Sequence, residues 1–155
     1  MINLLPSHDE TLVLPFSAEE VFNRFSRVTS NDITSVRDKA ILFSGWVKED
    51  RFRISLKINR PNNYIPLAKG KIEATSSGCI IFIDYQLFPT TKLFVTFWLL
   101  LTCLFAIAIG FQYSSYWYFL GGLAIAVSIY LITRSNFQIQ LKITRDALLR
   151  VLNSN

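Results

Sequence analysis

Histidine, cysteine and charge within one long apolar stretch are scarce in this chain, and each scarcity excludes a class of function. The 155 residues include one histidine and two cysteines. His8 lies in a polar N-terminal segment and cannot alone supply the converging ligands or bases of a metal or Ser-His site. Cys79 and Cys103 fall in a soluble strand and in an apolar helix, so no disulfide framework is expected. We therefore predict a protein that is not an enzyme and needs no cofactor or metal.

Nucleotide and nucleic-acid chemistry also lacks its usual signals. The sequence contains no CxxC, GxGxxG or GxxxxGK[ST] pattern. Its net charge of +5 is modest, and no run of Lys and Arg interleaved with aromatic residues indicates nucleic-acid binding. Asp84 is the most interesting carboxylate because it lies inside an apolar strand. We expect it to face solvent or to pair with a cross-strand Lys or Arg.

Charge is absent from the 41 residues between Lys92 and Arg134. One helix of that length would be about 60 Å long, at roughly 1.5 Å per residue, about twice the thickness of a bilayer core of roughly 30 Å. Gly110 and the polar residues that follow it break the stretch. We therefore predict a transmembrane hairpin over residues 93–133, with helices at about 93–110 and 117–133.

Aromatic and basic residues mark the ends of the predicted spans. The turn carries no Lys or Arg, so the positive-inside rule places both chain ends in the cytoplasm. The N-terminus lacks the basic and apolar regions of a signal peptide, so the hairpin is predicted to be internal and retained. The expected membrane-interface residues are Lys92, Trp98, Tyr113, Tyr116, Trp117, Tyr118 and Arg134.

The residues ahead of the hairpin, 1–92, predict a small cytoplasmic α+β domain. Ser17 and Glu20 form a capping box that starts a helix ending near Ser30. Alternating apolar residues predict strands near 11–16, 41–47, 52–58, 67–75 and 79–88. The expected architecture is an antiparallel sheet of about five strands with one N-terminal helix. The strands near 52–58 and 67–75 give the sheet a basic outer face, formed by Arg51, Arg53, Lys57, Lys69 and Lys71.

The C-terminal segment, residues 134–155, has two interpretations. Residues 136–143 alternate as in a strand, but Phe137, Leu141, Thr144 and Leu148 also share one helical face. We favour a cytoplasmic amphipathic helix that runs on from the second span and packs on the α+β domain. Small residues on the second span allow close helix packing, either within the hairpin or against another subunit. These candidate helix-docking residues are Gly121, Gly122, Ala124 and Ala126.

Two resemblances support this architecture. Residues 43–73, residues 87–98 ("LFPTTKLFVTFW") and the later Phe137 resemble a group of small bacterial two-span membrane proteins of unknown function. This resemblance implies a bacterial inner membrane protein. The stretch "TLVLPFSAEEVFNRFSRV" (11–28) resembles the opening of lipid-binding helix-grip domains, although a membrane hairpin does not belong to that fold.

Two functional hypotheses follow. The favoured one is an accessory or scaffold subunit that anchors a cytoplasmic domain, contacts membrane lipids and docks to a protein partner or to a second copy. The alternative is a membrane-tethered binding module for a lipid or other apolar ligand. Its cavity would be lined by the apolar strand residues Phe43, Phe52, Ile54, Leu56, Ile81, Ile83 and Tyr85.

Overall fold

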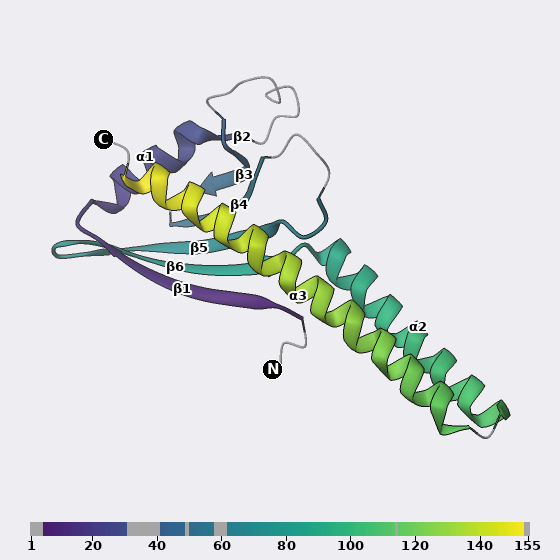
Figure 1. Ribbon diagram of the computed structural model, residues 1–155. Coiled ribbons are helices and arrows are strands. Elements are labelled where there is room, and N and C mark those ends of the chain that lie inside the picture. Colours follow the sequence, from purple (N-terminus) through teal and green to yellow (C-terminus); the bar gives the residue numbers. More distant parts are fainter. Residues whose placement is uncertain (1–4, 31–40, 49, 58–61, 114, 154–155) are drawn as a thin grey trace.

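The structure is a computed structural model that describes residues 5–30, 41–48, 50–57, 62–113 and 115–153 of the chain. These ranges form an α+β fold with an N-terminal helix and two long apolar C-terminal helices, as the sequence predicts. Figure 1 shows the sheet at one end and the helical hairpin extending away from it. The elements are β1 (Ser7–Leu14), α1 (Ala18–Val28), β2 (Thr29–Ser30), β3 (Phe43–Lys48), β4 (Arg51–Leu56), β5 (Pro66–Thr75), β6 (Gly78–Leu87), α2 (Pro89–Tyr113) and α3 (Tyr116–Asn153).

The sheet has six strands in the order β1-β6-β5-β4-β3-β2, so the prediction of about five antiparallel strands is wrong. The additional strand is β2, two residues that follow α1 directly and pair in parallel with the start of β3. Two residues are too few for an alternating pattern to reveal a strand. All other pairs are antiparallel. Strand β1 forms the opposite edge of the sheet and pairs with β6 from Ser7–Gln86 to Leu14–Cys79.

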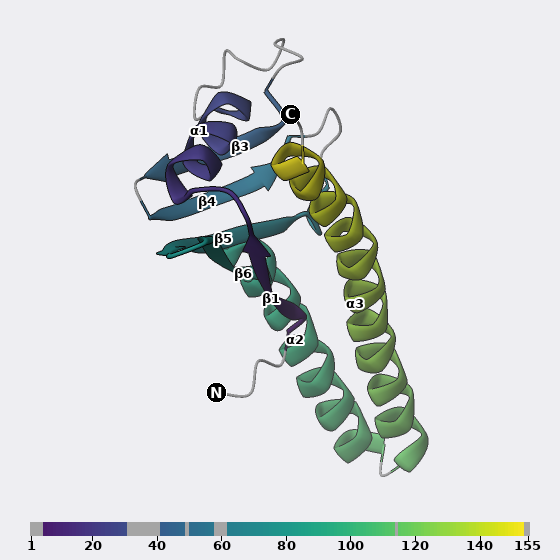
Figure 2. The same cartoon turned by 90° about the vertical axis from the view of Figure 1, so that its left-hand side faces the viewer.

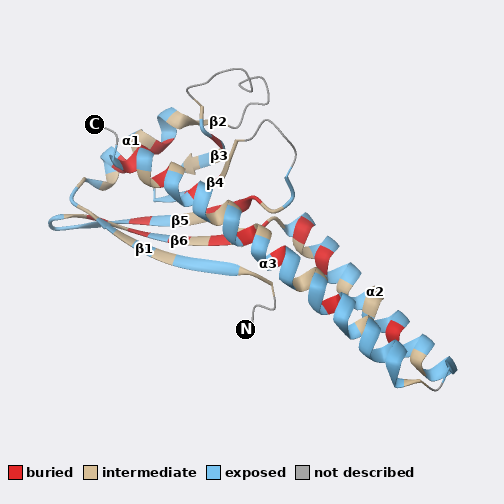
Figure 3. Cartoon of the chain, viewed as in Figure 1, coloured by how far each residue is buried: buried red, intermediate tan, exposed pale blue. Residues whose placement is uncertain are grey.

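One face of the sheet carries the core. Alternate residues of β6 point toward this face and are buried, because side chains alternate between the two faces of a strand. The C-terminal half of α3 and the shorter α1 lie over this face, as the two views of the chain show (Figures 1 and 2). Figure 3 shows buried residues gathered there and sparse along the hairpin. The buried residues of β6 are Cys79, Ile81, Ile83, Tyr85 and Leu87.

Helix α1 begins at the predicted cap and is fixed to the sheet by aromatic packing. The Ser17 hydroxyl accepts a hydrogen bond from the Glu20 amide at 3.2 Å. On the buried side, the Phe25 ring lies 5.0 Å from the ring of Phe52 on β4. Phe52 is opposite Gly70 of β5, and a Cβ at Gly70 would meet the Phe52 ring at 2.1 Å. The absent side chain of Gly70 therefore provides the space that the Phe52 ring fills.

Helix α3 is a single helix of 38 residues that joins two predicted elements. The second predicted span, 117–133, and residues 134–153 of the predicted C-terminal helix are consecutive parts of it, and residues 136–143 are helical rather than a strand. The last two residues of that prediction lie outside the described residues. At about 1.5 Å per residue this helix is about 57 Å long. Its C-terminal half contributes Phe137, Leu148, Val151 and Leu152 to the core beneath it.

Candidate functional site

The hairpin is the most distinctive feature of the described chain. Both α2 and α3 are long and apolar enough to cross a membrane. In their most apolar stretches only 6% and 11% of the residues are buried within the protein. A core helix of a soluble protein would be mostly buried, so these helices expose an apolar surface that the chain itself does not cover.

The predicted membrane-interface residues separate into two groups at opposite ends of the hairpin. Tyr116 and Trp117 at the turn are 87% and 82% exposed, and the Tyr113 and Tyr118 rings lie 5.3 Å apart across it. Trp98 lies toward the domain end and contacts the rings of Phe94 and Phe97. Such amphipathic rings gather where a membrane meets water.

The two basic residues at the domain end have different surroundings. Lys92 donates a hydrogen bond to the Gln86 side-chain oxygen at 2.6 Å, and Gln86 donates to the Asp84 carboxylate at 2.6 Å. Asp84 faces Lys69 across the strand pair but forms no ion pair with it, and the hydrogen-bond partner of its half-buried carboxylate is the Gln86 amide. Arg134 has no ion-pair partner in the described ranges of the chain.

The domain and the hairpin are joined without a flexible linker at either point. Only Phe88 separates β6 from α2, and its carbonyl accepts the Lys92 amide at 2.9 Å. The Thr91 hydroxyl in the first turn of α2 donates to the Asn63 carbonyl at 2.9 Å. On the return, α3 passes from the hairpin into the core of the domain as an unbroken helix. Both connections therefore restrict rotation of the domain relative to the hairpin.

The four candidate helix-docking residues do not share one environment. Gly122 lies at the crossing of α2 and α3, where a Cβ would come within 2.1 Å of the Ala106 Cβ. Ala126, one turn later, is buried, and Gly122 is partly exposed. Gly121 has open space around its position, and Ala124 is exposed. The first pair packs the hairpin, and the second faces away from it.

The basic outer face of the sheet is a cluster of cations on β4 and β5. The register places Arg51 opposite Lys71 and Arg53 opposite Lys69. Like charges directly opposite one another destabilise a strand pair. Lys71 is neutralised by Glu73 at 2.7 Å and Arg51 is 3.7 Å from Asp50. Lys57 follows β4 directly.

Two cations of this outer face form no ion pair with a described residue, although the Asp84 carboxylate lies on the strand position opposite one of them. Arg53 and Lys69 have no ion pair within the part of the chain that the structure describes. Trp46, 39% exposed, is the strand neighbour of Arg53, and the Lys48 ammonium lies 5.7 Å from its ring centroid. Cations without an ion pair suit contact with an acidic surface, and an exposed tryptophan is typical of protein interfaces.

An ion pair links the first strand to the last helix. The Arg145 guanidinium on α3 contacts the Glu10 carboxylate on β1 at 2.6 Å. This contact raises the pKa of Arg145, first through the hydrogen bond and then through the negative charge of Glu10. Burial, with the nearby Glu10 charge, raises the pKa of Tyr85. The sequence prediction missed this pair because it began the first strand at residue 11, which left Glu10 outside the sheet.

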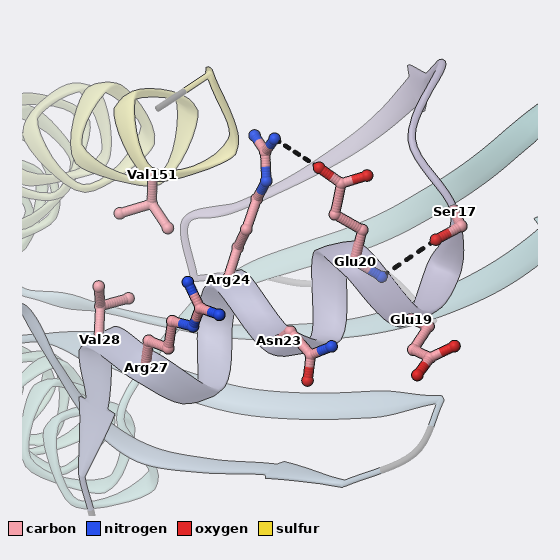
Figure 4. Close-up of a pocket in the computed structure, with 8 residues that line it drawn as sticks. All are labelled: Ser17, Glu19, Glu20, Asn23, Arg24, Arg27, Val28 and Val151. Atoms are coloured by element: carbon pink, nitrogen blue, oxygen red, sulfur yellow. Dashed lines mark hydrogen bonds and ion pairs between the residues drawn. The ribbon is translucent and has the colours of Figure 1, made fainter. Parts of the chain in front are cut away.

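A polar groove of about 500 Å³ lies between α1 and the end of α3 (Figure 4). Arg24 bridges its two walls: it pairs with Glu20 at 2.6 Å and donates to the Leu152 carbonyl. Its guanidinium also lies 4.2 Å from the Phe16 ring centroid. These contacts use the Arg24 charge to hold α1 against α3, so the groove fulfils a structural role.

The residues proposed to line an apolar ligand cavity instead contribute to the packed core. Phe43, Ile54 and Tyr85 have no exposed surface, and Leu56 is half-buried against them. His8 lies beside Tyr85, with ring centroids 6.2 Å apart.

Among the described residues, no three His, Cys, Asp or Glu side chains gather closely enough to hold a metal ion. No protein-family model, curated protein or solved structure matches this chain.

Proposed function

We propose that this chain is a non-enzymatic integral membrane protein that acts as an accessory or scaffold subunit of a larger membrane complex. The observation that carries the proposal is the absence of a linker at both joints between domain and hairpin. A tether needs only a flexible connection, whereas a scaffold must present its surface in a fixed orientation. The direct passage of β6 into α2, and the continuity of α3, supply such a fixed orientation.

The basic outer face is the surface that the scaffold presents. Arg53 and Lys69 form no ion pair within the described ranges, and Trp46 adds an exposed aromatic ring on the strand next to Arg53. Cations on a rigid sheet give a partner with acidic side chains both orientation and rapid association. Residues on the core face are unsuited to docking, because the helices already cover them.

The proposed location is a bacterial inner membrane, with both chain ends in the cytoplasm. Lys92 and Arg134 mark the domain end of the hairpin, while the turn carries no basic residue. Topology is tested with a membrane-impermeant maleimide on intact cells that carry Cys103→Ser. Ser115→Cys in the turn is expected to react from outside, whereas Ser55→Cys in the domain reacts only after the cells are opened. The reverse pattern would place the domain outside.

Docking is tested by affinity purification of the full chain from native membranes in a mild detergent. A protein partner is expected at a fixed stoichiometry in the wild type. The double variant Arg53→Glu, Lys69→Glu should lose it, because two attractive contacts become repulsive. Lys142→Glu is the matched control, since it reverses an exposed cation on α3, away from the outer face. A wild-type protein that runs as a lone monomer, without any partner, would contradict the scaffold function.

A further inference from the structure

A stripe of α3 faces β1 and carries an arginine at each end. Arg134, Gln138, Leu141 and Arg145 are spaced by four, three and four residues, which places them on one side of a helix. Arg145 contacts Glu10 of β1. The other three residues line a cleft of about 310 Å³, together with Tyr130, Phe137 and residues 5–8 at the start of β1.

The two arginines differ in what neutralises them. Arg145 has the Glu10 carboxylate, with Nε–O distances of 2.8 and 3.0 Å in addition to the Nη2 contact. Arg134 has no carboxylate within ion-pair distance in the described part of the chain. The residue of β1 two positions before Glu10 on the same face is His8, which brings no negative charge. The cleft thus contains the cation of Arg134 but, among its described residues, no carboxylate like the Glu10 carboxylate that contacts Arg145.

The position of the cleft along α3 indicates the source of an anion that could pair with Arg134. Arg134 follows the last uncharged residue of the hairpin, and Tyr130 is one turn inside the apolar half of α3. Figure 1 shows the start of β1 near α3, where the helix leaves the hairpin for the domain, and residues of both segments line the cleft. On the membrane-spanning arrangement proposed above, this is the depth of the lipid headgroups.

We propose that this cleft binds the phosphate group of an anionic lipid, with Arg134 as its counter-charge. The inference rests on the proposed membrane anchoring of the hairpin. A guanidinium binds phosphate oxygens through two parallel hydrogen bonds, and Ser7, His8 and Gln138 add further donors. The volume is near the lower limit of ligand pockets, roughly 300 Å³, which suits a headgroup rather than a whole lipid. The acyl chains lie along the exposed apolar half of α3. This site is separate from the packed interior of the sheet.

The test is native mass spectrometry of the full-length, delipidated protein titrated with dioleoylphosphatidylglycerol or dioleoylphosphatidylcholine. The wild type is expected to bind its first phosphatidylglycerol more tightly than phosphatidylcholine. Arg134→Gln should weaken that step at least about tenfold, because a bidentate charged contact is lost. The control Lys92→Gln removes the other boundary cation and should weaken it at most about fivefold, the general attraction of one cation to anionic lipid.

A second variant keeps Arg134 and neutralises its charge with a carboxylate on the same helix. Gln138→Glu places a carboxylate one helical turn from Arg134 and so gives it the negative charge that Glu10 of β1 gives Arg145. This variant should weaken phosphatidylglycerol binding as much as Arg134→Gln. Equal losses in Arg134→Gln and Lys92→Gln, or no preference for phosphatidylglycerol, would overturn the proposal. Displacement of the lipid by millimolar inorganic phosphate would assign the cleft to a soluble phosphate and overturn its lipid assignment.

Anchoring is measured separately, so that the two proposals can fail independently. The wild-type protein is reconstituted in neutral phosphatidylcholine vesicles and washed with alkaline carbonate. Release from the vesicles would contradict membrane anchoring, and the lipid site with it. Retention in the vesicles without any preference for phosphatidylglycerol in the titration would overturn the headgroup site alone.

Discussion

The two halves of α3 belong to one helix but are covered by different surroundings. In the half within the hairpin, large apolar side chains such as Ile125 and Leu131 are more than half exposed. In the half over the sheet, Phe137 and Leu148 are almost fully buried. The domain half keeps polar residues on its remaining sides, whereas the hairpin half has almost none. The comparison shows that the protein supplies the apolar surroundings of one half and leaves the other half exposed, which is the half that the proposed membrane anchoring would cover.

The largest expected effect is on stability: removing a phenylalanine ring should cost much more in the domain half of α3 than in the hairpin half. Phe137→Ala removes a ring that is 1% exposed and should lower the free energy of unfolding by about 3–5 kcal/mol. Phe119→Ala, in the hairpin half and 47% exposed, makes the same chemical change and should have a much smaller effect. Denaturant titration in a mild detergent, followed by fluorescence, measures both. Equal losses would show that the two halves are packed alike.

The next effect comes from a substitution that interrupts α3 where its two halves meet. Ser135→Pro removes a helical hydrogen bond and introduces a steric clash, at a cost of about 3 kcal/mol or more. Nitroxides on Ser128→Cys and Asp146→Cys, in a Cys103→Ser background, span 18 residues and should lie about 27 Å apart in a straight helix. We expect Ser135→Pro to broaden that distance distribution and the control Ser135→Ala to leave it narrow. An unchanged distribution in Ser135→Pro would mean that the domain holds the helix straight without its backbone hydrogen bonds.

A smaller effect tests the hairpin half alone. Gly122→Leu forces a side chain into the contact with Ala106 and should destabilise the packing of α2 on α3 by about 1–3 kcal/mol. Gly121→Leu makes the same gain in helix propensity but enters open space, so it should stabilise the helix slightly. Thermal unfolding in detergent compares the two. Equal stability of the variants would contradict close packing at Gly122.

The smallest effect concerns the ion pair on the domain half. Glu10→Gln should lower the free energy of unfolding by about 1 kcal/mol, because the Arg145 side chain is 44% exposed and water screens the interaction. The same change should leave phosphatidylglycerol binding in place, since Arg134 is intact. Double-mutant cycles with Arg145→Gln isolate the pair. A coupling energy near zero would show that the pair contributes nothing to stability.

Much of the fold could be predicted from the sequence, because its elements repeat short patterns. The cap at Ser17 and the alternation through β4 and β6 are local signals, and the structure confirms them. The two-residue β2 and its parallel pairing were missed, since neither has a periodic pattern. The pairing of Glu10 with Arg145, and the unpaired Arg134, depend on how β1 lies against α3. Contacts between residues more than 120 positions apart leave no signal in either segment alone.

Because α3 is the last of the described elements to be synthesised, the sheet is made before the helix that covers its apolar face. All six strands precede the hairpin, but the helix that covers their apolar face follows it. Leu148 leaves the ribosome 61 residues after Leu87, which is roughly 3–12 s later at about 5–20 residues per second. During that interval the newly made sheet has part of its apolar face uncovered. If the hairpin is inserted into a membrane as proposed, maturation of the domain is tied to that insertion, and a chain stalled before it would expose the apolar face of the sheet to chaperones and proteases.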